Sequence, residues 1–469
     1  MFVGREEELK TLERLYERKE FQMVVVYGRR RVGKTTLIDH FVREKPTLYF
    51  TAKIQSSMLN LKELTERVCR FFDLPASTPP FASWAAAFGF LAEKSRNNRF
   101  VFVFDELPYA AQVDPSLPSV LQAAIDHGFK QGGAFVILCG SNEGFMESEV
   151  LGRKSPLYGR RTGQIRLSPF DYRDASLMLS GTSPEEAIRY YATFGGTPYY
   201  LEQINPELGY KDNIARSIFD KSGVLYEEPM MLLRQELREP ATYNSILLAI
   251  AHGATEPARI ADWAGVNQNS VGKYLRTLIG LGLVERRVPF GENPGRSRNG
   301  IYSLSDPFFS FWYRFVGPAV DAIELGAGES LAASICASQA LPTYEGLQFE
   351  RICLQWVALQ NKQGKLPFLA TSFGKWWGTD PSIRETVAID LVAANKTQKA
   401  LLCGECKWRN SFDESEALRV AKQRSLLISG KWERRYVALF SKRPLSMATR
   451  EKVAGNDGVL LVSGEDLFK

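Results

Sequence analysis

Three runs of apolar residues in the first 140 positions end abruptly in small or charged residues. The runs are residues 22–27, 100–104 and 135–139. Continuous apolar runs of this length are typical of strands that are covered on both faces, as in a parallel α/β sheet. Residues 36–42 continue from the first run with apolar positions at helical spacing. The pattern therefore predicts a parallel sheet with packed helices in the first third of the chain.

The segment that joins the first strand to its helix is rich in glycine and basic residues. It fits the phosphate-loop pattern of two glycines four residues apart, followed by Lys and Ser or Thr. Such a loop directs N–H groups and a helix N-terminus at a polyphosphate. We expect Lys34 to reach the β- and γ-phosphates of ATP and Thr35 to hold Mg²⁺. The expected nucleotide-binding residues are Gly28, Arg29, Arg30, Arg31, Val32, Gly33, Lys34, Thr35 and Thr36.

Polar residues follow the other two predicted strands. Asp105 and Glu106 come directly after the second run, where parallel sheets bind their ligands. We expect Asp105 to complete the Mg²⁺ shell and Glu106 to polarise the attacking water. Ser141 and Asn142 follow the third run, where a small polar side chain would touch the γ-phosphate or orient water. Ordinary turn chemistry explains Ser141 and Asn142 as well.

Two arginines, Arg160 and Arg161, lie in the short segment LYGRRTG. Paired arginines on a loop stabilise the charge of a phosphoryl-transfer transition state, either in their own subunit or in a neighbour. A solvated basic turn is an equally good interpretation of the spacing. The sequence leaves both interpretations open.

Six blocks of sequence, in order, resemble the archaeal-type ATPase family, a branch of the AAA+/STAND P-loop proteins. They are FVGREEEL, GRRRVGKTT, FVFVFDE, LCGSN, LYGRRTGQIRLSPF and FGGTPYYL, within about residues 1–220. The resemblance implies ATP binding, dependence on Mg²⁺ and self-association into a homo-oligomer. It also implies that Val3 and Arg5 lie near the adenine. Pro198 would belong to a helical-lid element that senses the nucleotide.

Composition restricts the class of protein further. The 469 residues are 45% hydrophobic and 24% charged, which is typical of a globular protein with several domains. The chain contains no apolar run of about 18 residues, so we expect no membrane partner. The N-terminus is acidic, so we expect no signal peptide. Six unevenly spaced cysteines suggest reduced thiols and a cytoplasmic location. The net charge of +6 permits a nucleic-acid partner without demonstrating one.

The middle of the chain has the pattern of a winged helix-turn-helix. Three short helices, at 243–251, 257–264 and 271–279, precede two strands at 283–289 and 300–304. The third helix and the loop between the strands carry polar and basic residues suited to DNA contacts. A lid or protein-interaction module is the alternative. The residues expected to face DNA are Asn267, Gln268, Asn269, Ser270, Lys273, Arg276, Arg286, Arg287, Arg296 and Arg298.

Acidic residues are the candidate chemistry of the last third. Asp390 lies in a predicted strand at 385–394, and Glu405 and Lys407 lie in the next one, at 400–408. Side chains alternate along a strand, so Glu405 and Lys407 share a face, which Asp390 can join from its own strand. Clustered carboxylates require a hard cation such as Mg²⁺. A hairpin with a surface ion pair is the alternative.

The pattern Asp…Glu-x-Lys, with Glu350 on an upstream predicted helix, resembles the PD-(D/E)XK restriction-endonuclease-like fold. The surrounding sequence resembles the uncharacterised C-terminal domain that accompanies many archaeal-type ATPases. The resemblance implies that Asp390 and Glu405 bind metal, that Lys407 is the catalytic lysine and that Glu350 is an accessory acid at the metal. One departure is Ala388, because related domains often carry an acid at that position.

These expectations combine into one architecture. We predict a P-loop ATPase core at 1–170, a helical lid at 171–235, a winged helix at 236–305 and a nuclease-like α/β domain at 306–469. The predicted function is Mg²⁺-dependent ATP hydrolysis coupled to action on DNA. The alternatives are an ATP-gated transcription regulator and a STAND-like oligomeric scaffold, neither of which cuts DNA.

Overall fold

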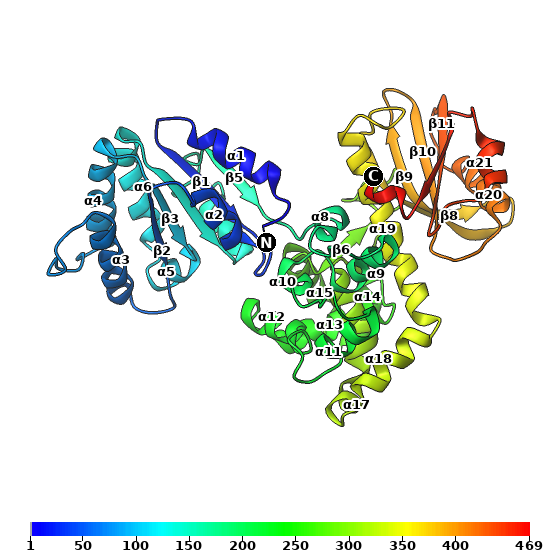
Figure 1. Cartoon of the computed structure of the whole chain (residues 1–469), viewed down its shortest axis with the longest axis horizontal. Coiled ribbons are helices and arrows are strands. Elements are labelled where there is room, and N and C mark those ends of the chain that lie inside the picture. Colours follow the sequence, from blue (N-terminus) through cyan, green and yellow to red (C-terminus); the bar gives the residue numbers. More distant parts are fainter. Residues whose placement is uncertain (1) are drawn as a thin grey trace. The chain divides into compact units, whose positions relative to one another are not determined.

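The computed structural model describes residues 2–469, which divide into two compact units with the break between Pro169 and Phe170 (Figure 1). The lid, winged helix and C-terminal domain expected from the sequence all lie in the second unit. No helix within residues 2–469 combines the length and the apolar character needed to cross a membrane.

The first unit is a five-stranded parallel sheet in the order β2-β3-β4-β1-β5. Its strands are β1 (Gln22–Tyr27), β2 (Thr47–Thr51), β3 (Val101–Asp105), β4 (Phe135–Gly140) and β5 (Gly163–Arg166). Its helices are α1 (Glu6–Tyr16), α2 (Lys34–Val42), α3 (Ser57–Phe71), α4 (Trp84–Asn97), α5 (Leu107–Val113), α6 (Leu117–His127) and α7 (Glu143–Phe145), with short turns η1 (Phe129–Gln131) and η2 (Met146–Val150). The α/β fold predicted for this part of the chain is confirmed.

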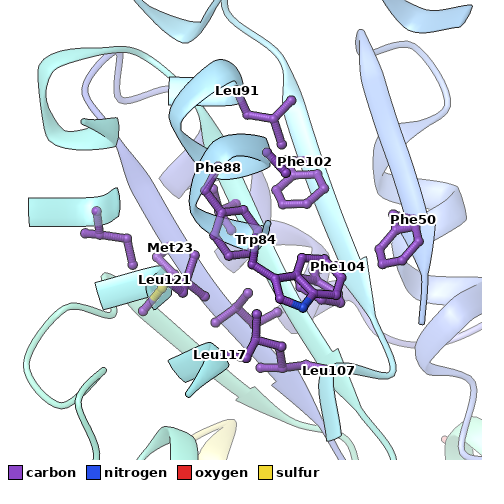
Figure 2. Close-up of a cluster of buried hydrophobic side chains, with 14 of the residues drawn as sticks. Met23, Phe50, Trp84, Phe88, Leu91, Phe102, Phe104, Leu107, Leu117 and Leu121 are labelled. Carbon is purple, nitrogen blue, oxygen red and sulfur yellow. The ribbon is translucent and has the colours of Figure 1, made fainter. Parts of the chain in front are cut away.

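Both faces of this sheet are covered by helices, which explains why its central strands are apolar throughout. Side chains alternate along β1, so Met23 packs toward α3–α6 and Val24 toward α1 and α2. Aromatic rings fill the first face, where Trp84 and Phe104 stack with ring centroids 5.6 Å apart (Figure 2). Truncating a buried Phe to Ala typically costs about 3–5 kcal/mol. This core therefore provides a firm base for the loops at the carboxyl ends of the strands.

The second unit begins with a helical region and a two-stranded antiparallel hairpin, β6 (Val284–Arg287) with β7 (Ile301–Leu304). Pro198 occupies the first turn of α10, and its part in nucleotide sensing stays a prediction. The helices are α8 (Tyr172–Ser176), α9 (Pro184–Phe194), α10 (Pro198–Leu201), α11 (Tyr210–Ser217), α12 (Glu228–Glu236), α13 (Pro240–Ala251), α14 (Pro257–Ala264), α15 (Gln268–Gly280), α16 (Pro307–Phe311), α17 (Val320–Glu324) and α18 (Gly328–Ala337), with turns η3 (Trp312–Val316) and η4 (Gly317–Ala319).

A second five-stranded sheet, in the order β12-β11-β10-β9-β8, ends the chain (yellow to red in Figure 1). Its strands are β8 (Ser372–Asp380), β9 (Glu385–Asn395), β10 (Ala400–Lys407), β11 (Arg434–Ser441) and β12 (Val459–Ser463). The helices of this region are α19 (Ala340–Lys362), α20 (Glu414–Ser425) and α21 (Met447–Val453), with a final turn η5 (Asp466–Phe468). The pairs β8–β9 and β9–β10 are antiparallel, whereas β10–β11 and β11–β12 are parallel.

The hairpin β6–β7 is joined to this sheet by hydrogen bonds. The backbone N–H of Phe290, just after β6, donates to the carbonyl of Lys375 in β8 at 2.9 Å. Arg351 of α19 donates to the carbonyl of Ser305, just after β7, at 2.8 Å, and forms a salt bridge with Glu285 of β6. The hairpin therefore packs as part of the second unit, and its loop is anchored at both ends.

Candidate functional site

The loop after β1 has a backbone that only glycine permits at its first position. Gly28 has φ 153°, and a Cβ there would lie 2.2 Å from the carbonyl oxygen of Leu167. Lys34 is only 8% exposed, and its ammonium donates to the carbonyl oxygens of Gly28 at 2.8 Å and Arg29 at 3.0 Å. These bonds hold the lysine over the loop, where phosphate oxygens would be its natural acceptors.

The rest of the loop curls through left-handed positions. Arg31 has φ 69° and Gly33 has φ 90°, and such turns direct successive N–H groups to one side to form an anion-binding concavity. Arg30 donates a hydrogen bond to the hydroxyl of Tyr109. Thr36 is exposed in the first turn of α2. The predicted phosphate loop therefore has the backbone shape that anion binding requires.

Arg5 braces the loop from behind. Its guanidinium donates to the carbonyl oxygens of Val32 at 3.0 Å and Ser168 at 2.7 Å, and the residue is 8% exposed. The backbone at Arg5 is left-handed, with φ 67°. Val3 is half-buried two residues earlier. The adenine contacts expected of Val3 and Arg5 stay a prediction, while the contacts that Arg5 makes in this structure support the loop itself.

The acids after β3 are held in different ways. Asp105 is 8% exposed, and one of its oxygens accepts a hydrogen bond from the hydroxyl of Tyr49 at 3.3 Å. Glu106 has a left-handed backbone, with φ 51°. Its carboxylate accepts bonds from the Ser141 hydroxyl at 3.0 Å and the Ser141 N–H at 3.3 Å. The residue expected to orient water is therefore bound to the residue expected beside the γ-phosphate.

Cys139 of β4 lies among the expected catalytic groups. Burial raises the pKa of this thiol well above its usual value, the neighbouring Asp105 carboxylate raises it further, and the Lys34 ammonium acts in the opposite direction. The Lys34 ammonium and the Asp105 carboxylate are therefore both close enough to the Cys139 sulfur to affect its pKa. With the exposed hydroxyl of Thr35, Asp105 provides the oxygen ligands that Mg²⁺ prefers. These residues fit a bound Mg²⁺-nucleotide, with Lys34 and the loop N–H groups as its phosphate contacts.

Glu143 is a residue of this site that sequence reasoning missed. The residue is only 6% exposed. Its carboxylate accepts a hydrogen bond from the N–H of Arg29 at 2.8 Å and forms a salt bridge with Arg166 at 2.7 Å. The preceding Asn142 caps α7 by accepting the N–H of Phe145 at 2.8 Å. The Oδ1 atom of Asn142 is thus already bonded, and the acid after it contacts the phosphate loop. An acid at the start of a short helix carries no signal of such a contact.

The paired arginines are placed differently from each other. Arg160 donates to Asp126 of α6 from Nε at 2.9 Å and Nη2 at 2.5 Å. These bonds, together with one from Lys130 at 2.7 Å, lower the pKa of Asp126 to about 2. Arg161 donates to the carbonyl oxygen of Leu151 at 3.4 Å. Within residues 2–469, none of the hydrogen bonds of these two side chains reaches the phosphate loop. A role for either arginine at the transition state stays a prediction.

A parallel sheet with a glycine-rich loop after a central strand, a lysine over that loop and acids at the end of a neighbouring strand defines a P-loop ATPase. The chain belongs to the family described as an ATPase domain predominantly from Archaea, whose model matches residues 2–204. A second family model, described as archaeal and bacterial proteins of unknown function, matches residues 312–420. The protein is therefore an ATP-binding ATPase with a further region of uncharacterised type.

The chain is also similar to individual archaeal proteins. An uncharacterised protein of Methanocaldococcus jannaschii is 31% identical over 445 residues, which cover 94% of this chain and 96% of the relative. An uncharacterised ATP-binding protein of the same archaeon is 51% identical over 45 residues, 10% of this chain and 76% of that protein. Among solved structures, a Walker-type ATPase of Pyrococcus abyssi is 20% identical with a TM-score of 0.49, covering 67% of this chain and 96% of that one.

The acids of the second unit are arranged otherwise than expected. The register between β8 and β9 shifts between Gly374 and Trp376, so Asp390 lies in a bulge opposite Lys375. The ammonium of Lys375 is 2.6 Å from a Glu350 oxygen and 3.6 Å from an Asp390 oxygen. Burial raises the pKa of Glu350, and the nearby Asp390 raises it further. Lys375 thus lies between two carboxylates that were expected to share a metal ion.

Glu405 points to the other side of the sheet. It is 5% exposed and pairs with Lys407 at 2.6 Å and with Arg424 of α20 at 3.6 Å. No three His, Cys, Asp or Glu side chains among residues 2–469 are grouped to hold a metal ion. The bulge directs Asp390 toward Glu350 of α19, while Glu405 faces α20. The expected metal set of Glu350, Asp390 and Glu405 is therefore not assembled, and these residues do not fit a shared Mg²⁺.

Proposed function

We propose that this ATPase binds DNA through its second unit and that the nucleotide bound at the phosphate loop changes how tightly it does so. The proposal takes α13, α14, α15 and the β6–β7 hairpin together as a winged helix-turn-helix. In that fold the third helix enters the major groove, and the wing contacts the DNA backbone. The function is then that of an ATP-gated DNA-binding protein.

The observation that carries the proposal is the polar face of α15. Val271 and Leu275 are buried, whereas Lys273 and Arg276 are exposed. Neither basic side chain forms a hydrogen bond or ion pair within the described residues 2–469. Exposed cations on the third helix of such a fold are suited to DNA phosphates.

The wing supplies fewer cations than the sequence suggested. Arg286 donates to the carbonyl oxygens of Pro294 at 2.5 Å and Ser297 at 2.9 Å, so it braces the loop from within. Arg287 pairs with Glu285 at 3.0 Å. The exposed arginines of the loop are Arg296 and Arg298. These two are the wing residues that we expect to contact the DNA backbone.

Fluorescence anisotropy with labelled duplex DNA at several salt concentrations tests DNA binding. The double variant Lys273→Ala with Arg276→Ala should bind more weakly to every sequence, and the slope of log affinity against log salt should fall by about 2. A matched control, Lys10→Ala with Lys19→Ala, removes two exposed cations from the first unit and should leave both quantities unchanged. Equal binding by the two double variants would refute the proposal.

The ATP dependence is tested in the same assay. Lys34→Ala should lose ATP binding, whereas Glu106→Gln should bind ATP and fail to hydrolyse it. DNA affinity should therefore be insensitive to ATP in Lys34→Ala and locked in its ATP-bound value in Glu106→Gln. Sedimentation with and without ATP measures self-association, which the family resemblance leads us to expect. Identical DNA affinity of wild type with and without ATP would contradict gating.

DNA cleavage by the C-terminal sheet is the other function that the sequence suggested. We favour binding without cleavage, because Lys375 lies between Glu350 and Asp390 while Glu405 points away. Incubation with Mg²⁺ or Mn²⁺ and plasmid DNA should therefore leave the plasmid intact. Cleavage that disappears in Asp390→Ala and Lys407→Ala would overturn this choice in favour of a nuclease.

A further inference from the structure

A cavity of about 470 Å³ lies in the second unit, between α13, β7, α19 and β8. Apolar side chains such as Ile301 and Leu347 form part of its wall, together with the indole of Trp377. Gln348 and Arg287 are among the polar residues of the lining. The lining therefore combines apolar side chains with converging polar and charged groups, and a cavity of this size with such a lining is suited to a small ligand.

Two buried polar atoms in this lining have no partner in the described part of the chain. They are Oε1 of Gln348, a residue only 5% exposed, and Nε of Arg287. The Nη2 atom of Arg287 is already used, since it donates to the Ser303 hydroxyl at 2.9 Å and pairs with Glu285. Buried polar groups are nearly always hydrogen-bonded. Gln348 and Arg287 both line the cavity, so a ligand that offers both a donor and an acceptor would supply the partners that these two atoms lack.

The charge of the lining is mostly positive. Arg351 is held by Glu285 and the Ser305 carbonyl, and Lys375 is held by Glu350. Arg314 differs, because it is exposed and its guanidinium lies over the ring of Phe315, 5.6 Å from the ring centroid. Arg314 is therefore the lining cation that is available to an anionic group of a ligand.

We propose that this cavity binds one nucleotide, with its base against Trp377 and its phosphate toward Arg314. A nucleobase has a flat face for the indole and an edge that carries both donors and acceptors, which Gln348 and Arg287 would read. The site is distinct from the phosphate loop. The nucleotide can come from two sources. One is the unpaired end of a DNA strand, in which case the inference rests on the proposed function. The other is a free nucleotide.

The full chain carrying Lys34→Ala tests the proposal, because nucleotide binding at the phosphate loop is then removed. Each of dAMP, dCMP, dGMP and dTMP is titrated by calorimetry, and labelled hairpin DNA with a one-nucleotide overhang is compared with blunt hairpin DNA by anisotropy. A free-nucleotide site should bind at least one mononucleotide. A strand-end site should bind the overhang at least fivefold more tightly than the blunt end.

Substitutions at the cavity locate the binding. Gln348→Met and Arg314→Ala should each weaken it at least fivefold, whereas Trp263→Leu, at an exposed tryptophan of α14, should not. Gln348→Met should keep the wild-type melting temperature of the second unit in scanning calorimetry, which shows that the region around the cavity folds. The proposal is overturned if no mononucleotide binds and overhang and blunt DNA bind equally, or if Gln348→Met changes nothing.

The two proposals fail separately. Blunt duplex binding that depends on Lys273 but shows no overhang preference, with no mononucleotide bound, would support DNA binding and refute the cavity. Mononucleotide binding that depends on Gln348, in a protein with no duplex affinity, would support the cavity as a free-nucleotide site and refute DNA binding.

Discussion

Replacing Arg5 by alanine should damage the phosphate loop without removing any group that faces the phosphates. The guanidinium bonds to the carbonyl oxygens of Val32 and Ser168 from a position that is 8% exposed. Hydrogen bonds from a charged donor contribute about 1.5–3 kcal/mol each, so the loss of two should cost roughly 3–6 kcal/mol. In a unit of this size, 1 kcal/mol shifts the melting temperature by about 2–4 °C. We therefore expect its melting temperature to fall by at least about 6 °C.

The nucleotide affinity should fall with it, because Val32 belongs to the loop. If ATP binding must supply about 1.4 kcal/mol of free energy to order the loop in the variant, ATP binds roughly tenfold more weakly. Calorimetric titration with Mg²⁺-ATP and with inorganic tripolyphosphate measures this loss, and differential scanning calorimetry measures the stability. Arg5→Lys retains the charge but not the two-pronged geometry, so it should be intermediate. Arg14→Ala, at an exposed position of α1, should match wild type.

The comparison of the two ligands separates two roles for Arg5. A brace behind the loop should weaken ATP and tripolyphosphate by the same factor, because both depend on the shape of the loop. Direct contact with adenine should weaken ATP alone. Unchanged tripolyphosphate affinity together with an unchanged melting temperature would refute the bracing role.

Three further predictions concern other parts of the molecule. Gly28→Ala should fold with a lower melting temperature and lose most ATP affinity in calorimetry, because a Cβ would collide with backbone and strain of this kind costs about 1–3 kcal/mol before any displacement. Arg160→Ala should raise the midpoint of acid unfolding measured by circular dichroism. The lowered pKa of Asp126 adds stability above its unfolded pKa, which is lost between about pH 4 and pH 2 as the folded pKa of about 2 is approached. Lys375→Met should destabilise the second unit by about 3–5 kcal/mol in urea unfolding at pH 8. The loss should be smaller at pH 5, because the raised pKa of Glu350 favours its neutral form as the pH falls; equal losses at both pH values would contradict this.

Sequence reasoning succeeded where the chemistry is local. The strands β1, β3 and β4 were predicted because strands covered on both faces must be apolar at every position. β2 was missed because its residues alternate between buried and half-buried, and β5 because it has four residues with one buried. The backbone shape of the phosphate loop could also be predicted, since it depends on consecutive residues, while the nucleotide contacts of those residues stay a prediction. The bracing role of Arg5 could not be predicted from the sequence, because its partner Ser168 is 163 positions away in the chain.

The second unit marks the limit of this reasoning. Strand alternation placed Glu405 and Lys407 on one face, and they are paired there. The same rule allowed Asp390 to join them, but a bulge opposite Lys375 turned it toward Glu350. A bulge depends on how two strands pair, and neither strand alone carries a signal for it.

The amino-acid sequence by itself determined that this protein is an ATPase, because a phosphate-binding loop is made by neighbouring residues whose conformations are set by glycine, charge and strand burial. Only the tertiary structure decided which distant side chains meet. Glu143 contacts the loop, Arg160 pairs with Asp126, and Lys375 lies between two acids. These side-chain contacts follow from strand register and helix packing. Register and packing depend on many weak contacts over the whole fold, so no short sequence pattern predicts them.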